Sequence, residues 1–105
     1  TFYRTGEGAH PDNQRLAKLI QQELVAITRH TSRSTSTDIH QFILENIHVP
    51  AATIEVGFLS NPEEARLLNE PDYQQTVAWA IFTGLAKYFA DADSIRSAPA
   101  VGSLR

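Results

Sequence analysis

Apolar residues recur every three or four positions across residues 13–28, while charged residues occupy the positions between them. This spacing is typical of an amphipathic helix with one buried stripe. Asp12 immediately precedes the pattern, and aspartate is a common cap at a helix N-terminus. The pattern predicts a helix from Asp12 or Asn13 to about Thr28, with an apolar stripe of Leu16, Leu19, Ile20, Leu24 and Ile27.

A second helical pattern begins at Pro71 and carries two apolar stripes instead of one. Because the two stripes together cover most of the helix circumference, the pattern predicts a helix that is largely buried. One stripe comprises Val77, Ile81, Leu85 and Tyr88, and the other comprises Trp79, Phe82, Ala86 and Phe89.

Residues 50–61, PAATIEVGFLSN, form a mostly apolar run of small and β-branched residues that ends at Gly57. Such a run predicts a central β-strand followed by a turn. Asn61 can then cap a short helix, Pro62 suits its first position, and the Glu64 side chain can reach back to the Asn61 N–H. We therefore expect a strand, a turn and a short helix, in that order.

The remaining segments carry weaker patterns. Residues 1–5 contain Phe2 and Tyr3 with β-branched neighbours, which predicts a short strand. Residues 29–38 are rich in Ser and Thr, which favours a surface loop, and residues 39–47 fit either a short buried strand or a single helical turn. Because strands alternate with helices, the fold class predicted is α/β.

Composition limits the size and the partners of the protein. With 105 residues, 42% of them hydrophobic, the chain can bury one core. Nine basic and twelve acidic residues give a net charge of −3 without a long run of like charges, so nucleic acid is not a predicted partner. No stretch approaches the roughly 20 apolar residues that span a bilayer. The chain lacks cysteine, which excludes a disulfide framework and a thiolate metal site.

The domain organisation follows from where periodicity is lost. Residues 1–90 carry the helical and strand patterns and are expected to form one domain. Residues 91–105 are rich in Ser, Ala, Pro and Gly, a composition typical of a linker or a disordered tail.

Glu55 is the main candidate for chemistry. It lies between Ile54 and Val56, at the C-terminal end of a strand that reads as buried on both faces. Burial would raise the pKa of its carboxyl toward the range that a general acid or base needs, and active sites of α/β proteins gather at this end of strands. The alternatives are that Glu55 lies on an exposed strand face or pairs with a cation such as Arg33.

The four histidines give a weaker signal. His10, His30, His40 and His48 are scattered, with no pair at i and i+4 on a helix and no H-E-x-x-H arrangement. We expect solvated loop histidines and no complete metal site within this chain.

Two long segments resemble a known family. VPAATIEVGFLSNPEEARLL followed by YQQTVAWAIFTGLAKYF is similar to the end of the zinc-dependent N-acetylmuramoyl-L-alanine amidases, cell-wall hydrolases of amidase type 3. FYRTG resembles the strand after that family's second zinc histidine, and NQRLAKLIQQEL resembles the helix that follows. The resemblance covers residues 1 to about 90 and implies the C-terminal half of the catalytic domain, with a partial mixed sheet flanked by helices.

The resemblance also implies a mechanism. Zinc, held by two histidines and a glutamate, would polarise the scissile amide between the muramoyl lactyl group and L-alanine, and a late-strand glutamate would assist the attacking water. Glu55 matches that glutamate. The family's zinc ligands all precede the strand that Thr1 begins here, so no metal ligand is carried onto this chain. Ser34 and Glu45 stand where the family often has a glycine and a basic residue, and substrate-binding residues stay unassigned.

The expected partners are peptidoglycan and the missing N-terminal half of the same domain, and the expected location is the bacterial cell envelope or the exterior. The isolated chain is expected to be inactive, marginally stable and prone to association. Two other functions remain open from the sequence: a non-catalytic module that binds peptidoglycan or regulates, and a structural interaction domain in which Glu55 is an ion-pair partner.

Overall fold

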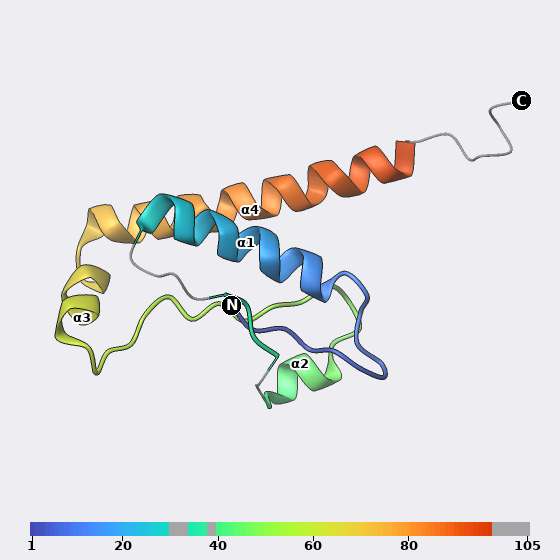
Figure 1. The fold of residues 1–105 in the computed structure, drawn as a ribbon, viewed down its shortest axis with the longest axis horizontal. Coiled ribbons are helices and arrows are strands. Elements are labelled where there is room, and N and C mark those ends of the chain that lie inside the picture. The colour runs from blue at the N-terminus through green and yellow to red at the C-terminus, as the bar shows by residue number, and fades with distance from the viewer. Residues whose placement is uncertain (30–33, 38–39, 98–105) are drawn as a thin grey trace, which may run out of the picture.

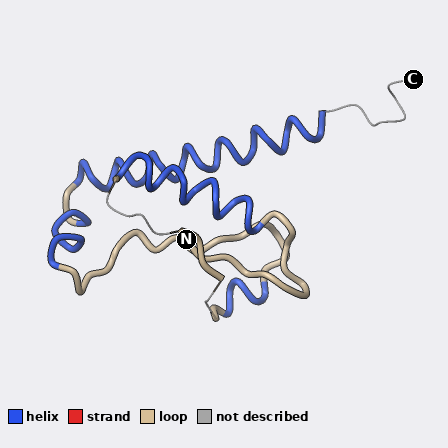
Figure 2. Tube along the Cα trace, viewed as in Figure 1, coloured by secondary structure: helices blue, strands red, loops and turns tan. Residues whose placement is uncertain are grey.

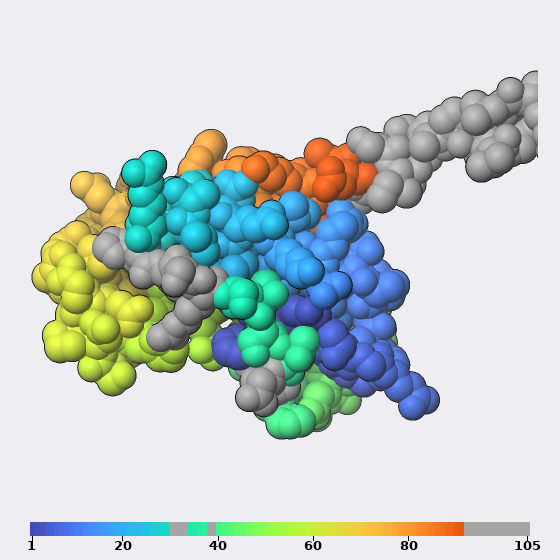
Figure 3. Space-filling view, viewed as in Figure 1, coloured from blue at the N-terminus to red at the C-terminus, as the bar shows by residue number. Residues whose placement is uncertain are grey.

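The computed structural model describes residues 1–29, 34–37 and 40–97 of the chain. In this part of the chain the regular elements are helices, and the two longest run side by side (Figure 1). The shorter two lie apart from each other on the same side of α1 (Figure 3). The helices are α1 at Asn13–Thr28, α2 at Phe42–Asn46, α3 at Pro62–Leu68 and α4 at Pro71–Ser97.

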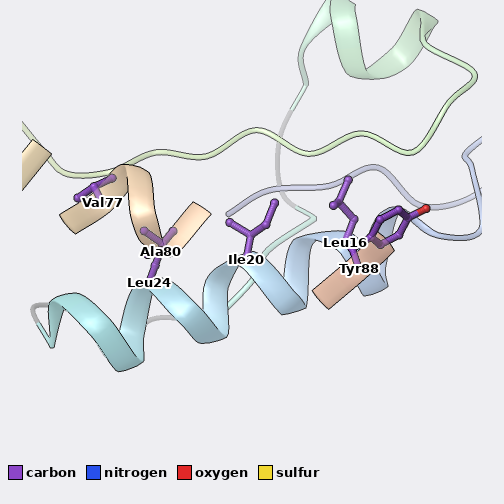
Figure 4. Close-up of a cluster of buried hydrophobic side chains, with 6 residues drawn as sticks. All are labelled: Leu16, Ile20, Leu24, Val77, Ala80 and Tyr88. Atoms are coloured by element: carbon purple, nitrogen blue, oxygen red, sulfur yellow. The ribbon is translucent and has the colours of Figure 1, made fainter. Parts of the chain in front are cut away.

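The core lies between α1 and α4. Leucine and isoleucine side chains from one stripe of α1 meet a stripe of α4 (Figure 4). Each fully buried aliphatic side chain of this kind contributes roughly 1.5–3 kcal/mol to stability. The buried cluster comprises Leu16, Ile20, Leu24, Val77, Ala80 and Tyr88.

The close contact of α1 and α4 depends on Gly84. A Cβ atom added at Gly84 would lie 2.7 Å from the Ile20 Cα and 3.0 Å from the Ile20 nitrogen. Both neighbouring atoms belong to the backbone of α1, which cannot rotate away as a side chain does. Glycine is therefore required for the two helices to approach this closely.

The predicted first helix is confirmed, but its expected cap is not. Asp12 occupies the N-cap position of α1 without a side-chain capping bond. Its carboxylate instead accepts hydrogen bonds from the Tyr88 hydroxyl at 2.8 Å and from Arg15 at 3.1 Å. At the other end Arg29 adopts a left-handed conformation with φ 56°, and its N–H bonds the Val25 carbonyl.

The short helix predicted after Asn61 is confirmed as α3, together with its cap. The Asn61 side chain accepts from the N–H groups of Glu63 at 3.0 Å and Glu64 at 3.2 Å. Pro62 takes the first helical position. The Glu64 carboxylate, however, accepts from the Phe58 N–H at 3.3 Å and not from the Asn61 N–H. The side chain therefore ties α3 to the segment before the turn.

The ambiguous segment at residues 39–47 forms a helical turn where the structure describes it. α2 spans Phe42–Asn46, and of its first three side chains only Leu44 is buried. Phe42 and Ile43 are 82% and 64% exposed. The apolar run was therefore a poor guide to how deeply this segment lies.

The prediction that the last helix is largely buried is wrong. Trp79, Phe82 and Phe89 are 61%, 58% and 60% exposed. The reason is that α1 covers one stripe of α4 and leaves the second stripe without a covering element in the described part of the chain. The helix also continues to Ser97, past residue 90, and residues 98–105 lie outside the described part.

The predicted α/β fold with a partial mixed sheet flanked by helices is also wrong. Among the described residues no strand forms, and Figure 2 shows loops where strands were expected. Phe2 makes single bridges, antiparallel to Thr53 and parallel to Ser36. A ladder requires pairing at successive positions, and here the pairing stops after one residue on each side. β-branched residues favoured extended backbone without supplying partners for a sheet.

Candidate active site

Three extended segments meet beside α1 and α3 and enclose a cavity of about 590 Å³. Gln21 of α1 and Glu64 of α3 close two of its sides. Hydroxyl, amide and carboxylate groups contribute to the wall together with apolar residues. The lining residues are Thr1, Phe2, Gln21, Ser34, Thr35, Ser36, Glu55, Val56, Gly57, Phe58 and Glu64.

The pairing of Phe2 fixes the walls of this cavity. The Phe2 N–H donates to the Thr53 carbonyl at 2.8 Å, and the Thr53 N–H donates to the Phe2 carbonyl at 2.9 Å. On the other side, the Tyr3 N–H donates to the Ser36 carbonyl at 3.1 Å, and the Ser36 N–H donates to the Thr1 carbonyl at 3.0 Å. The segments that carry the polar lining residues are thus joined through one short stretch of backbone.

Glu55 lies two residues after Thr53 and lines the cavity. Its side chain is exposed, so the expectation of a strand buried on both faces is wrong at this position. Burial therefore gives no reason to assign chemistry to Glu55, which lies instead on the wall of the cavity. The predicted alternative partner, Arg33, lies outside the described residues, and no other lysine or arginine in the described part forms an ion pair with Glu55.

The backbone nitrogen of Thr1 donates a hydrogen bond to Gln21 Oε1 at 2.8 Å, and both residues are buried. Because both residues line the cavity, this bond ties its lining to α1.

Glu64 is a second carboxylate on the same cavity. Glu55 and Glu64 also line a smaller neighbouring cavity of about 40 Å³. The sequence pattern assigned Glu64 to helix capping and gave no sign that it lies beside Glu55. Gln21 and residues 34–36 were missed as lining residues for the same reason, because their proximity depends on tertiary pairing. Ser34, one of the two positions that depart from the family pattern, lies on this cavity.

The described histidines do not gather at the cavity. His10 Nδ1 accepts from the Asp12 N–H at 3.1 Å. His40 lies 3.5 Å from Glu45 with a side chain that is 93% exposed, and His48 is exposed. His30 lies outside the described residues.

A zinc ion would not fit the described residues alone. Zinc in a hydrolase takes three protein ligands, usually with histidine among them. The cavity offers the carboxylates of Glu55 and Glu64, and nowhere in the described part do three histidine, aspartate or glutamate side chains gather closely enough to hold a metal ion.

Comparison with known proteins identifies the family. The family model for N-acetylmuramoyl-L-alanine amidase matches residues 1–87. The chain therefore belongs to the N-acetylmuramoyl-L-alanine amidase family, as the resemblance predicted.

Individual relatives agree with the family. The chain is 42% identical over 84 residues to the germination-specific N-acetylmuramoyl-L-alanine amidase of Bacillus subtilis, a match that covers 80% of this chain and 35% of that protein. It is 38% identical over 61 residues to the amidase AmiA of Escherichia coli, which covers 57% of this chain and 21% of that one.

A solved structure is similar as well. The CwlD amidase of Clostridioides difficile, determined in complex with the GerS lipoprotein, superposes with a TM-score of 0.76 at 34% identity. The match covers 85% of this chain and 44% of the CwlD chain. The chain thus spans less than half the length of these relatives. In the described part, no helix combines the length and the apolarity needed to cross a membrane.

Proposed function

We propose that this chain is part of a peptidoglycan hydrolase that cleaves the amide bond between the N-acetylmuramoyl lactyl group and L-alanine. Family membership over residues 1–87 supports the reaction. The observation that carries the assignment within the chain is the position of Glu55, an exposed carboxylate on the wall of a cavity of about 590 Å³. We assign Glu55 as the catalytic carboxylate.

In this proposal Glu55 moves a proton. Hydrolysis of an amide requires that the attacking water lose a proton and that the leaving nitrogen gain one. The Glu55 carboxylate would accept the proton from the water and donate it to the nitrogen of the leaving L-alanine. An exposed carboxylate is available to a substrate that enters from solvent, which a deeply buried ion pair would not be.

The lining of the cavity suits a polar substrate. Its volume of about 590 Å³ lies within the usual range of ligand sites, about 300–1,000 Å³. The hydroxyl groups of residues 34–36 and the amide of Gln21 are groups that hydrogen-bond sugar hydroxyls and peptide amides. Peptidoglycan offers both kinds of group. Because peptidoglycan lies in the bacterial cell envelope, we expect the enzyme to act in the envelope or outside the cell.

Zinc is also part of this proposal, with its ligands supplied by another segment of the whole enzyme. The described residues do not complete a zinc site. We propose that two histidines and a glutamate from a segment preceding Thr1 hold the metal, and that the chain on its own is inactive.

The test is Glu55→Gln in the full-length enzyme. Glutamine keeps the size of the side chain but cannot accept the proton, so amide hydrolysis of a purified muropeptide is expected to fall by about 10²- to 10⁴-fold. Release of the free peptide amine would be measured by chromatography. Glu7→Gln, an exposed loop position away from the cavity, is the matched control and should keep full activity.

Full activity of Glu55→Gln would overturn the assignment. The same assay on the isolated chain, with zinc content measured in parallel, tests the metal proposal. Activity with stoichiometric zinc in the isolated chain would show that its own side chains bind the metal. Binding to cell wall without hydrolysis by the full-length protein would favour the non-catalytic binding module.

A further inference from the structure

Glu64 lies where it can hydrogen-bond the backbone of the segment that carries Glu55. It is in the first turn of α3, and its Oε2 accepts the Phe58 N–H at 3.3 Å. Phe58 is three residues after Glu55 on the same extended segment. A side chain on one element thus holds the segment that bears the proposed catalytic group.

The end of α3 that holds Phe58 is itself well fixed. The Asn61 N–H donates to the Phe58 carbonyl at 3.0 Å, while the Asn61 side chain caps the helix. Arg66 pairs with Glu63 at 2.7 Å and with Glu70, which stabilises the helix from its exposed side. Both the N–H and the carbonyl of Phe58 are therefore bonded to residues at the start of α3.

Gly57 brings the segment against α3. A Cβ added at Gly57 would lie 3.2 Å from Leu68 Cδ1 and 3.7 Å from Glu64 Cβ. The backbone at this position therefore lies against the α3 side chains, with little room for a side chain of its own. Glu55 then stands between two anchored positions, since Thr53 on its other side makes two hydrogen bonds with Phe2 at 2.8 and 2.9 Å.

We propose that Glu64 is a positioning residue for Glu55, holding the Phe58 N–H and thereby fixing the backbone that presents the catalytic carboxylate to the cavity. This inference rests on the proposed function. A displacement of about 1 Å in a catalytic group can cost as much as 10²-fold in rate, so an anchor three residues away affects turnover more than substrate binding.

The alternative is that Glu64 acts through its charge, because it lines the same cavity as Glu55. Two conservative variants separate the two roles. Glu64→Gln keeps the length and an oxygen that accepts the Phe58 N–H, but loses the charge. Glu64→Asp keeps the charge and is one methylene too short to reach.

The experiment measures kcat and KM for muropeptide amide hydrolysis by the full-length enzyme. The kcat of Glu64→Gln is expected to stay within about 3-fold of wild type, whereas Glu64→Asp and Glu64→Ala should lose about 10-fold or more, with KM within about 2-fold. Glu7→Gln, an exposed position away from α3, is the control. It removes a carboxylate charge that does not line the cavity, and it should leave kcat unchanged.

Two results would overturn the positioning role. One is a wild-type kcat in Glu64→Ala, and the other is a Glu64→Gln variant more impaired than Glu64→Asp. Hydrogen exchange over residues 55–60 gives a second readout that does not depend on catalysis: exchange at Phe58 should be faster in Glu64→Asp than in Glu64→Gln, and equal rates would contradict the proposal.

The Glu55→Gln variant, assayed in the same series, separates the two proposals. If Glu55→Gln is inactive and Glu64→Ala is fully active, the positioning role alone fails. If Glu55→Gln is fully active, the catalytic role of Glu55 fails and the positioning role fails with it. If Glu64→Ala does not fold, the contrast between glutamine and aspartate still decides.

Discussion

At the scale of single residues, the carboxylate of Asp12 joins the start of α1 to α4. The hydrogen bond from Tyr88, assisted by Arg15, holds the pKa of Asp12 below its usual value even though desolvation acts in the opposite direction. Burial, together with the same hydrogen bond and the charge of Asp12, raises the pKa of Tyr88. Arg15 also lies over the Tyr88 ring at 4.2 Å from its centroid. The cluster is therefore most favourable when Asp12 is ionised and Tyr88 is neutral.

This cluster predicts a loss of stability at both ends of the pH range. The contribution of Asp12 is complete above its unfolded pKa of about 3.9 and is lost as the pH falls through its lowered folded pKa. The contribution of Tyr88 is complete below its unfolded pKa of about 10 and is lost as the pH rises through its raised folded pKa.

Tyr88→Phe tests this prediction because it keeps the buried ring and removes the hydroxyl. We expect the free energy of unfolding to fall by about 1 kcal/mol at neutral pH. This is less than the roughly 1.5–3 kcal/mol of a hydrogen bond to a charged group, because the Asp12 side chain is 38% exposed and solvent screens its charge. When the free energy of unfolding is measured with urea between about pH 3 and 11, it should decline less steeply at both ends for Tyr88→Phe than for wild type. Parallel pH curves for the two proteins would contradict it.

How much of this was visible in the sequence differs between residues. Glu55 was selected from its place in an apolar segment and from the family pattern. It lines a cavity, and its catalytic role stays a prediction. Its exposure could not be foreseen, since burial depends on what covers a segment. Asp12 was assigned a local capping role because its actual partner, Tyr88, lies 76 residues away. Local rules contain no information about such a partner.

At the scale of the helices, the contact of α1 with α4 predicts a severe effect at Gly84. Replacing glycine with alanine inside a helix normally stabilises it by about 0.5–1 kcal/mol. Here the new methyl group would collide with the Ile20 backbone at 2.7 Å, and overpacking of this kind costs about 1–3 kcal/mol. We expect Gly84→Ala to be destabilising overall, as measured by denaturant unfolding.

The control for this substitution is Ala86→Ser, an exposed position on the same helix. It should change stability by no more than about 0.5 kcal/mol. A stabilised Gly84→Ala variant would mean that α1 and α4 separate without cost and that the glycine is not needed for their packing.

The elements themselves were predictable where the signal is local. α1 and α3 follow from helical spacing and from the Asn61 and Pro62 cap, all of which lie within a few residues of the helices that they define. The expected sheet failed because pairing joins distant segments. Residues with strand propensity adopted extended backbone, yet Phe2 pairs only once with each neighbour.

At the scale of the whole molecule, the second stripe of α4 stands out. Trp79, Phe82 and Phe89 are all more than half exposed, and the Trp79 and Phe82 rings pack on each other with centroids 5.4 Å apart. The sequence carries two apolar stripes on this helix, as predicted. It holds no local signal that α1 covers only one of them. An exposed aromatic surface of this kind favours association.

We therefore expect the isolated chain to self-associate with rising concentration. Sedimentation analysis of wild type and of a Trp79→Gln, Phe82→Gln double variant would check this, with the double variant shifted toward monomer. Phe42→Gln, on α2 and 82% exposed, serves as the control and should not change the association. A monomeric wild type that melts cooperatively would contradict the expectation.

The double pairing of Phe2 has a consequence for the order in which the molecule is assembled. Contacts between residues distant in sequence form more slowly than contacts within a helix. The first residues of the chain cannot complete their bonds until Ser36 and Thr53 have both been synthesised, and α3 must then form before Glu64 can hold Phe58. Translation therefore produces α1 well before it can produce the cavity, and the packing of α1 against α4 comes later still because α4 begins only at Pro71.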